Sequence, residues 1–365
     1  MGTIILHVGM PKTGSTSIQT WIQRAAPVLR DAHGIQVMHD TLSRDAGASM
    51  VPYEGTGGVA TIGFLLRLQA ALNTDATPAT LHEITDQFAL SLDAAAHAHG
   101  TVLATSEGLS TPIIRGVEPF LDSLGSLTSS HSVRIVCYVR PQHTAIVSRW
   151  RQWGWLEDLP PGEWVEAQAD DLAYRDWLNR ARAAMPAVTW DIRPYRKDLL
   201  TGGDVVIDFA GAVVGSPVAA AGSDTVPEDN AGLPLDLVIA LRGAPKSLTQ
   251  TPGAELPGRM ESGLRQRNLG TIVQNWQLPE SDAARRSLEV VHAHSWQRFE
   301  ASNQELIDEF GWNATAFIDE PTDASDALSE LDELWQPTPS AADPYLYAAL
   351  TQLCETLEND SPTSG

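Results

Sequence analysis

Short apolar runs alternate along the chain with longer stretches in which apolar residues recur every three or four positions. The runs predict buried strands at residues 4–8, 34–39, 101–106, 133–139 and 188–194. The longer stretches predict helices from residue 15 onward and at 59–72, 79–99, 141–153, 170–184, 233–242 and 281–310, with another starting near 202–209. This alternation predicts an α/β fold, with a mostly parallel central sheet flanked by helices.

The remaining segments are poor in apolar periodicity. Residues 41–58 are rich in Gly, Ser and Asp and predict a loop, and residues 215–260 have a loop-like composition around the one helix at 233–242. The chain has 365 residues, enough for one α/β domain with insertions or for two small domains. We expect one domain over residues 1–318, with helical additions at its C-terminal end. An acidic tail with two short helices (326–335 and 343–358) follows over 319–365.

The turn after the first predicted strand is the clearest sign of function. It reads Gly9-Met10-Pro11-Lys12-Thr13-Gly14, and the next helix opens on Ser15, Thr16 and Ser17. Backbone N–H groups of such a turn, together with the positive end of the helix dipole, favour an anion, and Lys12 adds a full charge. The two glycines have the spacing of a nucleotide P-loop, but Ser15 stands where the P-loop lysine would be. The alternative is an ordinary strand–turn–helix corner with a solvated lysine.

Two segments resemble one enzyme family. Pro11-Lys12-Thr13-Gly14-Ser15-Thr16-Ser17 resembles the 5′-phosphosulfate loop of sulfotransferases that use 3′-phosphoadenosine 5′-phosphosulfate (PAPS). The strand 133–139 is followed by Arg140-Pro141 and by a helix that carries Ser148, which resembles the family's 3′-phosphate motif. An arginine suits this role because its planar guanidinium group matches phosphate oxygens. Both anion motifs occur in the order typical of the family.

The resemblance implies a P-loop-like sulfotransferase fold of bacterial type and a PAPS-binding site. Tyr195, after the fifth strand, is similar to a family tyrosine near the nucleotide, although a packing tyrosine is an equal alternative. The residues expected to bind PAPS are Lys12, Thr13, Gly14, Ser15, Thr16, Ser17, Arg140, Ser148 and Tyr195.

Sulfuryl transfer needs a group that meets negative charge on the leaving oxygen and a base for the acceptor. By analogy with in-line phosphoryl transfer, Lys12 is the candidate for the first role, and no metal is required. Glu107, at the end of the third strand, is the first candidate base, or else a carboxylate that caps a helix or pairs with an arginine. His7 is the second candidate, or else a buried structural histidine, and His39 is the third. Gly9, Glu107 and Arg140 all follow strand ends, where parallel sheets bind ligands.

Composition limits the partners. A net charge of −22 argues against nucleic acid or an anionic membrane. The two cysteines give neither a disulfide framework nor a metal cluster. The sequence shows no signal-peptide pattern and no bilayer-spanning apolar run, so we expect a cytoplasmic protein, with homo-oligomers left open.

The acceptor stays open between a small molecule, a sugar and a lipid. Trp150, Trp153, Trp155 and Trp164 either wall its site or pack in the core. Two other functions remain as alternatives: a P-loop nucleotide kinase or NTPase, and a non-catalytic nucleotide-binding protein with a degenerate site.

Overall fold

The computed structural model describes residues 1–43, 47–52, 63–73, 77–153, 159–215 and 282–318. These residues fall into two compact units. The first unit holds the sheet and most of the helices. The second unit holds helices α6 and α7 and the part of helix α14 up to Glu300.

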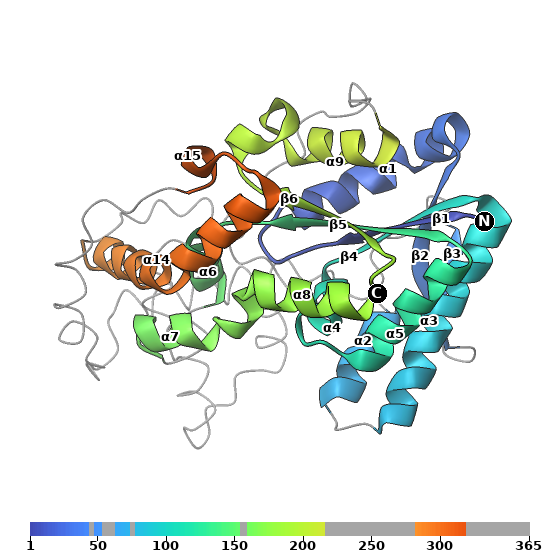
Figure 1. The fold of residues 1–365 in the computed structure, drawn as a ribbon, viewed down its shortest axis with the longest axis horizontal. Coiled ribbons are helices and arrows are strands. Elements are labelled where there is room, and N and C mark those ends of the chain that lie inside the picture. Colours follow the sequence, from blue (N-terminus) through green and yellow to red (C-terminus); the bar gives the residue numbers. More distant parts are fainter. Residues whose placement is uncertain (44–46, 53–62, 74–76, 154–158, 216–281, 319–365) are drawn as a thin grey trace, which may run out of the picture. The chain divides into compact units, whose positions relative to one another are not determined.

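The first unit is built on a six-stranded sheet with the order β3-β2-β4-β1-β5-β6 (Figure 1). Five strands are parallel, and β3 pairs with β2 in the antiparallel direction at one edge. Strands β1 and β4 are buried almost throughout, as expected for strands covered on both faces. The strands are β1 (Thr3–Val8), β2 (Ile35–Ser43), β3 (Gly47–Pro52), β4 (Thr101–Ser106), β5 (Ser132–Val139) and β6 (Thr189–Pro194).

Helices cover both faces of this sheet (Figure 1). Helices α1 (Ser15–His33) and α9 (Val205–Val214) pack on one face, where Ile18, Trp21 and Phe209 join a core with residues of β1, β2, β4 and β5. On the other face lie α2 (Gly63–Asn73), α3 (Pro78–His99), α4 (Ser110–Ile114), α5 (Glu118–Ser126) and α8 (Tyr174–Ala184). The rings of Phe64, Phe88 and Phe120 stack between α2, α3 and α5. The end of α14 (Asp282–Phe310) and α15 (Ala314–Phe317) complete this unit.

The second unit contains α6 (Gln142–Trp153) and α7 (Pro161–Ala167). Trp150 and Trp164 are buried, each with 2% of its surface exposed, so these two tryptophans belong to the core rather than to an open wall. The ring of His143 on α6 lies edge-on to those of His292 and Trp296 on α14. The side chain of Trp153, and Trp155 as a whole, lie outside the described residues.

The predicted α/β class with a mostly parallel, helix-covered sheet is confirmed, and each predicted strand corresponds to an observed one. The loop predicted for residues 41–58 is wrong in part, because β2 continues to Ser43 and residues Gly47–Pro52 form β3, which pairs antiparallel with β2. Residues 44–46 and 53–58 lie outside the described part of the chain. Small polar residues hid this hairpin, since alternation is the signal for a half-buried strand and these residues weaken it. The helices predicted at 233–242, 326–335 and 343–358 lie outside the described residues.

Within the described part of the chain, no helix combines the length and the apolar character that a membrane crossing requires.

Candidate functional site

The loop Gly9–Gly14, Glu107 and Arg140 all lie at the carboxyl ends of the parallel strands β4, β1 and β5. In register, Val8 of β1 lies opposite Ser106 of β4 and Cys137 of β5. The residues that continue beyond these strands include Gly9, Glu107 and Arg140. The Gly9 N–H donates to the Ser106 carbonyl at 3.1 Å, which ties the loop to the end of β4. This end of the sheet lies where α/β sheets place their ligands.

The loop folds around the carbonyl oxygen of Met10. The Thr13 hydroxyl donates to this oxygen at 2.7 Å and the Ser15 hydroxyl at 3.2 Å. Lys12 has a φ of 66°, which makes it the one non-glycine residue with a left-handed backbone in the described ranges. A side chain in this conformation costs of order 1 kcal/mol relative to glycine.

Two glycines allow the close packing of the loop. A Cβ atom on Gly9 would lie 2.6 Å from Ser15 Oγ and 3.0 Å from Glu107 Cγ. A Cβ atom on Gly14 would lie 2.9 Å from Val205 Cγ1 and 3.0 Å from Tyr195 Cε2. Tyr195 and the first residue of α9 therefore pack directly against the turn, and Glu107 packs against its first residue.

Helix α1 begins without a side-chain cap. Its N-cap residue is Gly14, with a φ of 73°, and the first helical bond runs from the Ile18 N–H to the Gly14 carbonyl. The first turn carries no acidic residue that would offset the positive end of the dipole. The start of α1 therefore favours an anion, and Lys12 adds its charge to the same turn.

Lys12 and Arg140 lie close enough for their charges to interact. Burial lowers the pKa of Lys12, the charge of Arg140 lowers it further, and the charge of Glu107 acts in the opposite direction. Burial also lowers the pKa of Arg140, against the effect of Tyr195. A cation whose charge is disfavoured by burial and by a neighbouring cation gains from an anionic ligand, so this end of the sheet suits a negatively charged molecule.

Glu107 stands beside this pair of cations. The residue is exposed to solvent, but partial desolvation of its carboxyl group beside the loop raises its pKa. The nearby Ser15 hydroxyl, which shares its one hydrogen with the Met10 carbonyl, and the charge of Lys12 oppose this rise. A reachable carboxylate with a raised pKa is a better proton acceptor than an ordinary glutamate.

His7 lies in the core below the loop. Its side chain is fully buried, Nδ1 lies 2.7 Å from Thr105 Oγ1, and the ring lies edge-on to Phe209. The Nε2 atom has no hydrogen-bond partner within the described residues. Burial lowers the pKa of His7 to about 3, so the imidazole stays neutral. This geometry fits the structural interpretation of His7 better than that of a base for an entering acceptor.

Of the other candidate residues, some lie beside the loop and some lie in other parts of the structure. Thr16 and Ser17 lie half-buried in the first turn of α1. Tyr195 is anchored by its N–H, which donates to the Val139 carbonyl at 2.7 Å. Ser148 lies on α6 in the second unit. His39 lies within β2, and its side chain is outside the described part.

Sequence reasoning missed a polar network that supports the site. Asp208 of α9 accepts hydrogen bonds from Tyr138 Oη (2.7 Å), Arg193 Nε (2.6 Å) and the Thr201 N–H (3.0 Å). Burial favours a higher pKa for Asp208, but these donors outweigh it and hold the pKa at about 2. The network fixes α9, whose first residue contacts Gly14, to β5 and β6. The one available signal was a carboxylate inside an otherwise apolar helix.

We found no family model, no curated protein and no solved structure that matches the chain. The site must therefore be interpreted from its own residues.

Proposed function

We propose that the protein is a PAPS-dependent sulfotransferase with the P-loop-like fold of that family. The observation that carries this proposal is the position of Lys12 and Arg140, each just beyond one of the paired strands β1 and β5, beside the uncapped start of α1, where the charge of Arg140 lowers the pKa of Lys12. The motif resemblance assigns these two residues to opposite ends of one doubly phosphorylated adenosine. A cytoplasmic location and a small-molecule, sugar or lipid acceptor belong to the same proposal.

The binding roles follow from the elements that carry the residues. Backbone N–H groups of the loop and of the first turn of α1, with the hydroxyls of Thr16 and Ser17, hold the 5′-phosphosulfate group. The hydroxyls of Thr13 and Ser15 keep the loop closed on Met10, and so act on shape as well as on the ligand. Arg140 binds the 3′-phosphate, and Ser148 is assigned to the same group by its motif alone.

The reaction transfers a sulfuryl group to an acceptor hydroxyl or amine. Glu107 removes the proton from the acceptor, whose oxygen or nitrogen bonds to sulfur while the bond from sulfur to the bridging phosphate oxygen breaks. Lys12 stabilises the negative charge on that leaving oxygen, and the proton remains on the Glu107 carboxyl group until solvent takes it. Positioning and charge stabilisation supply the rate, without a catalytic metal.

Two alternatives share the same loop. A P-loop kinase or NTPase would need a lysine where Ser15 stands. A non-catalytic nucleotide-binding protein would not need a carboxylate with a raised pKa beside the loop.

Ligand-induced thermal stabilisation separates these functions. We expect adenosine 3′,5′-bisphosphate to raise the melting temperature of the full chain more than ATP or AMP does, because only it carries a phosphate at both the 5′ and the 3′ position. Arg140→Ala should abolish this preference, whereas Arg24→Ala, at an exposed position of α1, should keep it. Equal shifts with all three nucleotides would contradict PAPS as the donor.

Turnover then tests catalysis. With labelled PAPS and a panel of hydroxylated small molecules, sugars, lipids and peptides, we expect label transfer to at least one class. Selective binding of the bisphosphate without transfer to any acceptor would favour the non-catalytic alternative.

A further inference from the structure

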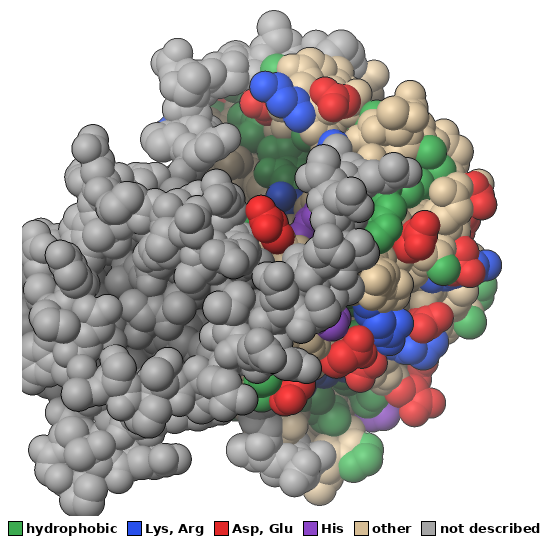
Figure 2. All heavy atoms as spheres, turned by 90° about the vertical axis from the view of Figure 1, so that its left-hand side faces the viewer, with side chains coloured by type: hydrophobic (Ala, Val, Ile, Leu, Met, Phe, Trp, Pro, Cys, Tyr) green, Lys and Arg blue, Asp and Glu red, His purple; other side chains and the backbone are tan. Residues whose placement is uncertain are grey.

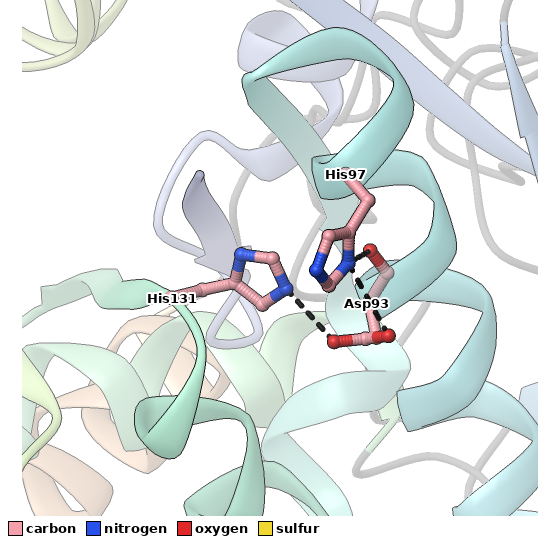
Figure 3. Close-up of side chains that lie close together, drawn as sticks. All are labelled: Asp93, His97 and His131. Atoms are coloured by element: carbon pink, nitrogen blue, oxygen red, sulfur yellow. Dashed lines mark hydrogen bonds and ion pairs between the residues drawn. The ribbon is translucent and has the colours of Figure 1, made fainter. Parts of the chain in front are cut away.

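A second cluster of titratable side chains lies at the opposite ends of the strands. Asp93 and His97 belong to the last turns of α3, and His131 directly precedes β5 (Figure 3). One ligand atom from each of the three residues lies within 4.8 Å of those of the others. The candidate sulfotransferase site is not involved, because it lies at the carboxyl ends of the same strands.

The three side chains converge without strain on either element. Asp93 and His97 are four residues apart on one helix and so share a face. His97 Nδ1 lies 2.9 Å from the Asp93 carbonyl oxygen and 3.4 Å from Asp93 Oδ2. His131 Nε2 lies 2.8 Å from Asp93 Oδ1. His131 is buried and His97 is exposed. One ligand is therefore held in the core, and an ion can reach the cluster from solvent on the side of His97.

We propose that Asp93, His97 and His131 bind a divalent transition-metal ion, with Zn²⁺ as the first candidate. Two imidazoles and one carboxylate are the donors that zinc, cobalt and nickel prefer, whereas Mg²⁺ and Ca²⁺ prefer oxygen alone. Three protein ligands leave one position of a tetrahedral zinc ion for water. The ion joins α3 to the start of β5 and stabilises the fold.

A backbone hydrogen bond to His131 fixes the tautomer of its imidazole, and metal binding at Nε2 requires the other tautomer. The Gly2 N–H donates to His131 Nδ1 at 3.1 Å, so Nδ1 carries the lone pair and Nε2 carries the hydrogen that Asp93 Oδ1 accepts. A metal ion at Nε2 takes the place of that hydrogen, and solvent returns a proton to Nδ1, so the imidazole stays neutral. The hydrogen bond from Gly2 is then given up.

Gly2 has little room to follow this change. A Cβ atom on Gly2 would lie only 2.5 Å from the Gly100 carbonyl oxygen, and the Gly2 carbonyl accepts from the Ser132 N–H at 2.9 Å. The His131 ring must therefore turn slightly, rather than the Gly2 peptide. This tautomer exchange is specific to metal binding through His131.

Competition between the full chain and a chromophoric chelator measures the affinity for Zn²⁺ and Co²⁺. We expect one equivalent to bind, with a higher melting temperature that Mg²⁺ does not reproduce. His97→Gln and Asp93→Asn should each weaken binding about tenfold or more. The matched control is His99→Gln, on an exposed residue of the same helical turn, and should bind as the wild type does. Absence of binding, or the same loss in His99→Gln, would overturn the proposal.

Long-range ¹H–¹⁵N spectra of the imidazoles test the third ligand without a variant at a buried position. The apo protein should show His131 with its hydrogen on Nε2, and the Zn²⁺ complex should show it on Nδ1. A His131 spectrum that stays unchanged in the presence of saturating Zn²⁺ would exclude His131 as a ligand and refute the three-residue site.

Discussion

Lys12 shows how a single residue connects backbone strain with chemistry. Its left-handed φ would suit glycine, yet the position holds a lysine beside Arg140 and Glu107. Under the proposed mechanism, we expect Lys12→Gly and Lys12→Ala to lose about 10²–10³-fold in turnover, because both lack the ammonium charge assigned to the leaving oxygen. Urea unfolding should show Lys12→Gly about 1 kcal/mol more stable than Lys12→Ala, since only glycine adopts this backbone freely. A Lys12→Ala variant with near-normal turnover would remove the catalytic role.

The proposed role of Glu107 as the base predicts how the rate depends on pH. Because its pKa is raised, kcat/KM should fall on the acid side at a higher pH than for an ordinary glutamate. Loss of the Ser15 hydroxyl should raise the pKa of Glu107 further. In Ser15→Ala, this fall of kcat/KM on the acid side (the acid limb) should therefore begin at a still higher pH. Glu107→Gln should remove the limb and about 10²–10⁴-fold of the rate, whereas His7→Asn should keep the limb. If His7→Asn instead removed the acid limb and most of the rate while Glu107→Gln kept both, His7 would be the base.

At the scale of elements, the start of α9 positions the loop. Asp208 holds α9 to β5 and β6 by accepting from Tyr138 and Arg193, and Val205 lies next to Gly14. Asp208→Asn should lower the free energy of unfolding by about 2–4 kcal/mol, because it removes the nearer of the two carboxylates that pair with Arg193 and leaves only Asp191, at 3.3 Å. The folded-state pKa is about 2, below the ordinary 3.8, so this contribution is present above pH 3.8 and is lost as the pH falls through 2.

Asp204→Asn provides the control for this substitution. Asp204 caps α9 by accepting from the N–H groups of Val206 and Ile207, and asparagine caps equally well. Chemical unfolding should therefore show little change for Asp204→Asn, although it removes the same charge from the same helix. Equal losses in the two variants would mean that charge on α9, rather than the network, stabilises the fold.

The sequence predicted the elements well and the tertiary contacts poorly. Apolar runs located the strands, and their ends located Gly9, Glu107 and Arg140, because parallel strands bring their carboxyl ends to one edge. The Asp208 network could not be predicted, since its donors come from strands and turns that only the fold brings together. The Asp93–His97–His131 cluster escaped for the same reason: His131 is far from the other two in sequence. The hairpin of β2 and β3 was hidden by its small polar residues.

At the scale of the whole molecule, the net charge of −22 acts against the local cations. Figure 2 draws the face that lies on the left-hand side of Figure 1. The described part of this face carries acidic and basic side chains interspersed, rather than a continuous basic area. At low salt, where the Debye length is about 30 Å, an approaching anion experiences mainly the net charge, whereas at physiological salt this length is about 8 Å and the net charge is largely screened. Lys12 and Arg140 act only near contact. Under the proposed function, the fold must therefore bind its anionic ligand by focused groups against a repulsive field.

This opposition predicts an unusual salt dependence of ligand association. In stopped-flow measurements, the association rate constant of adenosine 3′,5′-bisphosphate should rise or stay level between low and physiological salt, because salt screens the repulsion at long range. The dissociation rate constant should rise as well, since salt also weakens the contacts with Lys12 and Arg140. Adenosine, which is uncharged, serves as the control and should associate at a rate independent of salt. A steep fall in the association rate of the bisphosphate would mean that the local cations steer it from a distance, and that the net charge of the chain does not govern its approach.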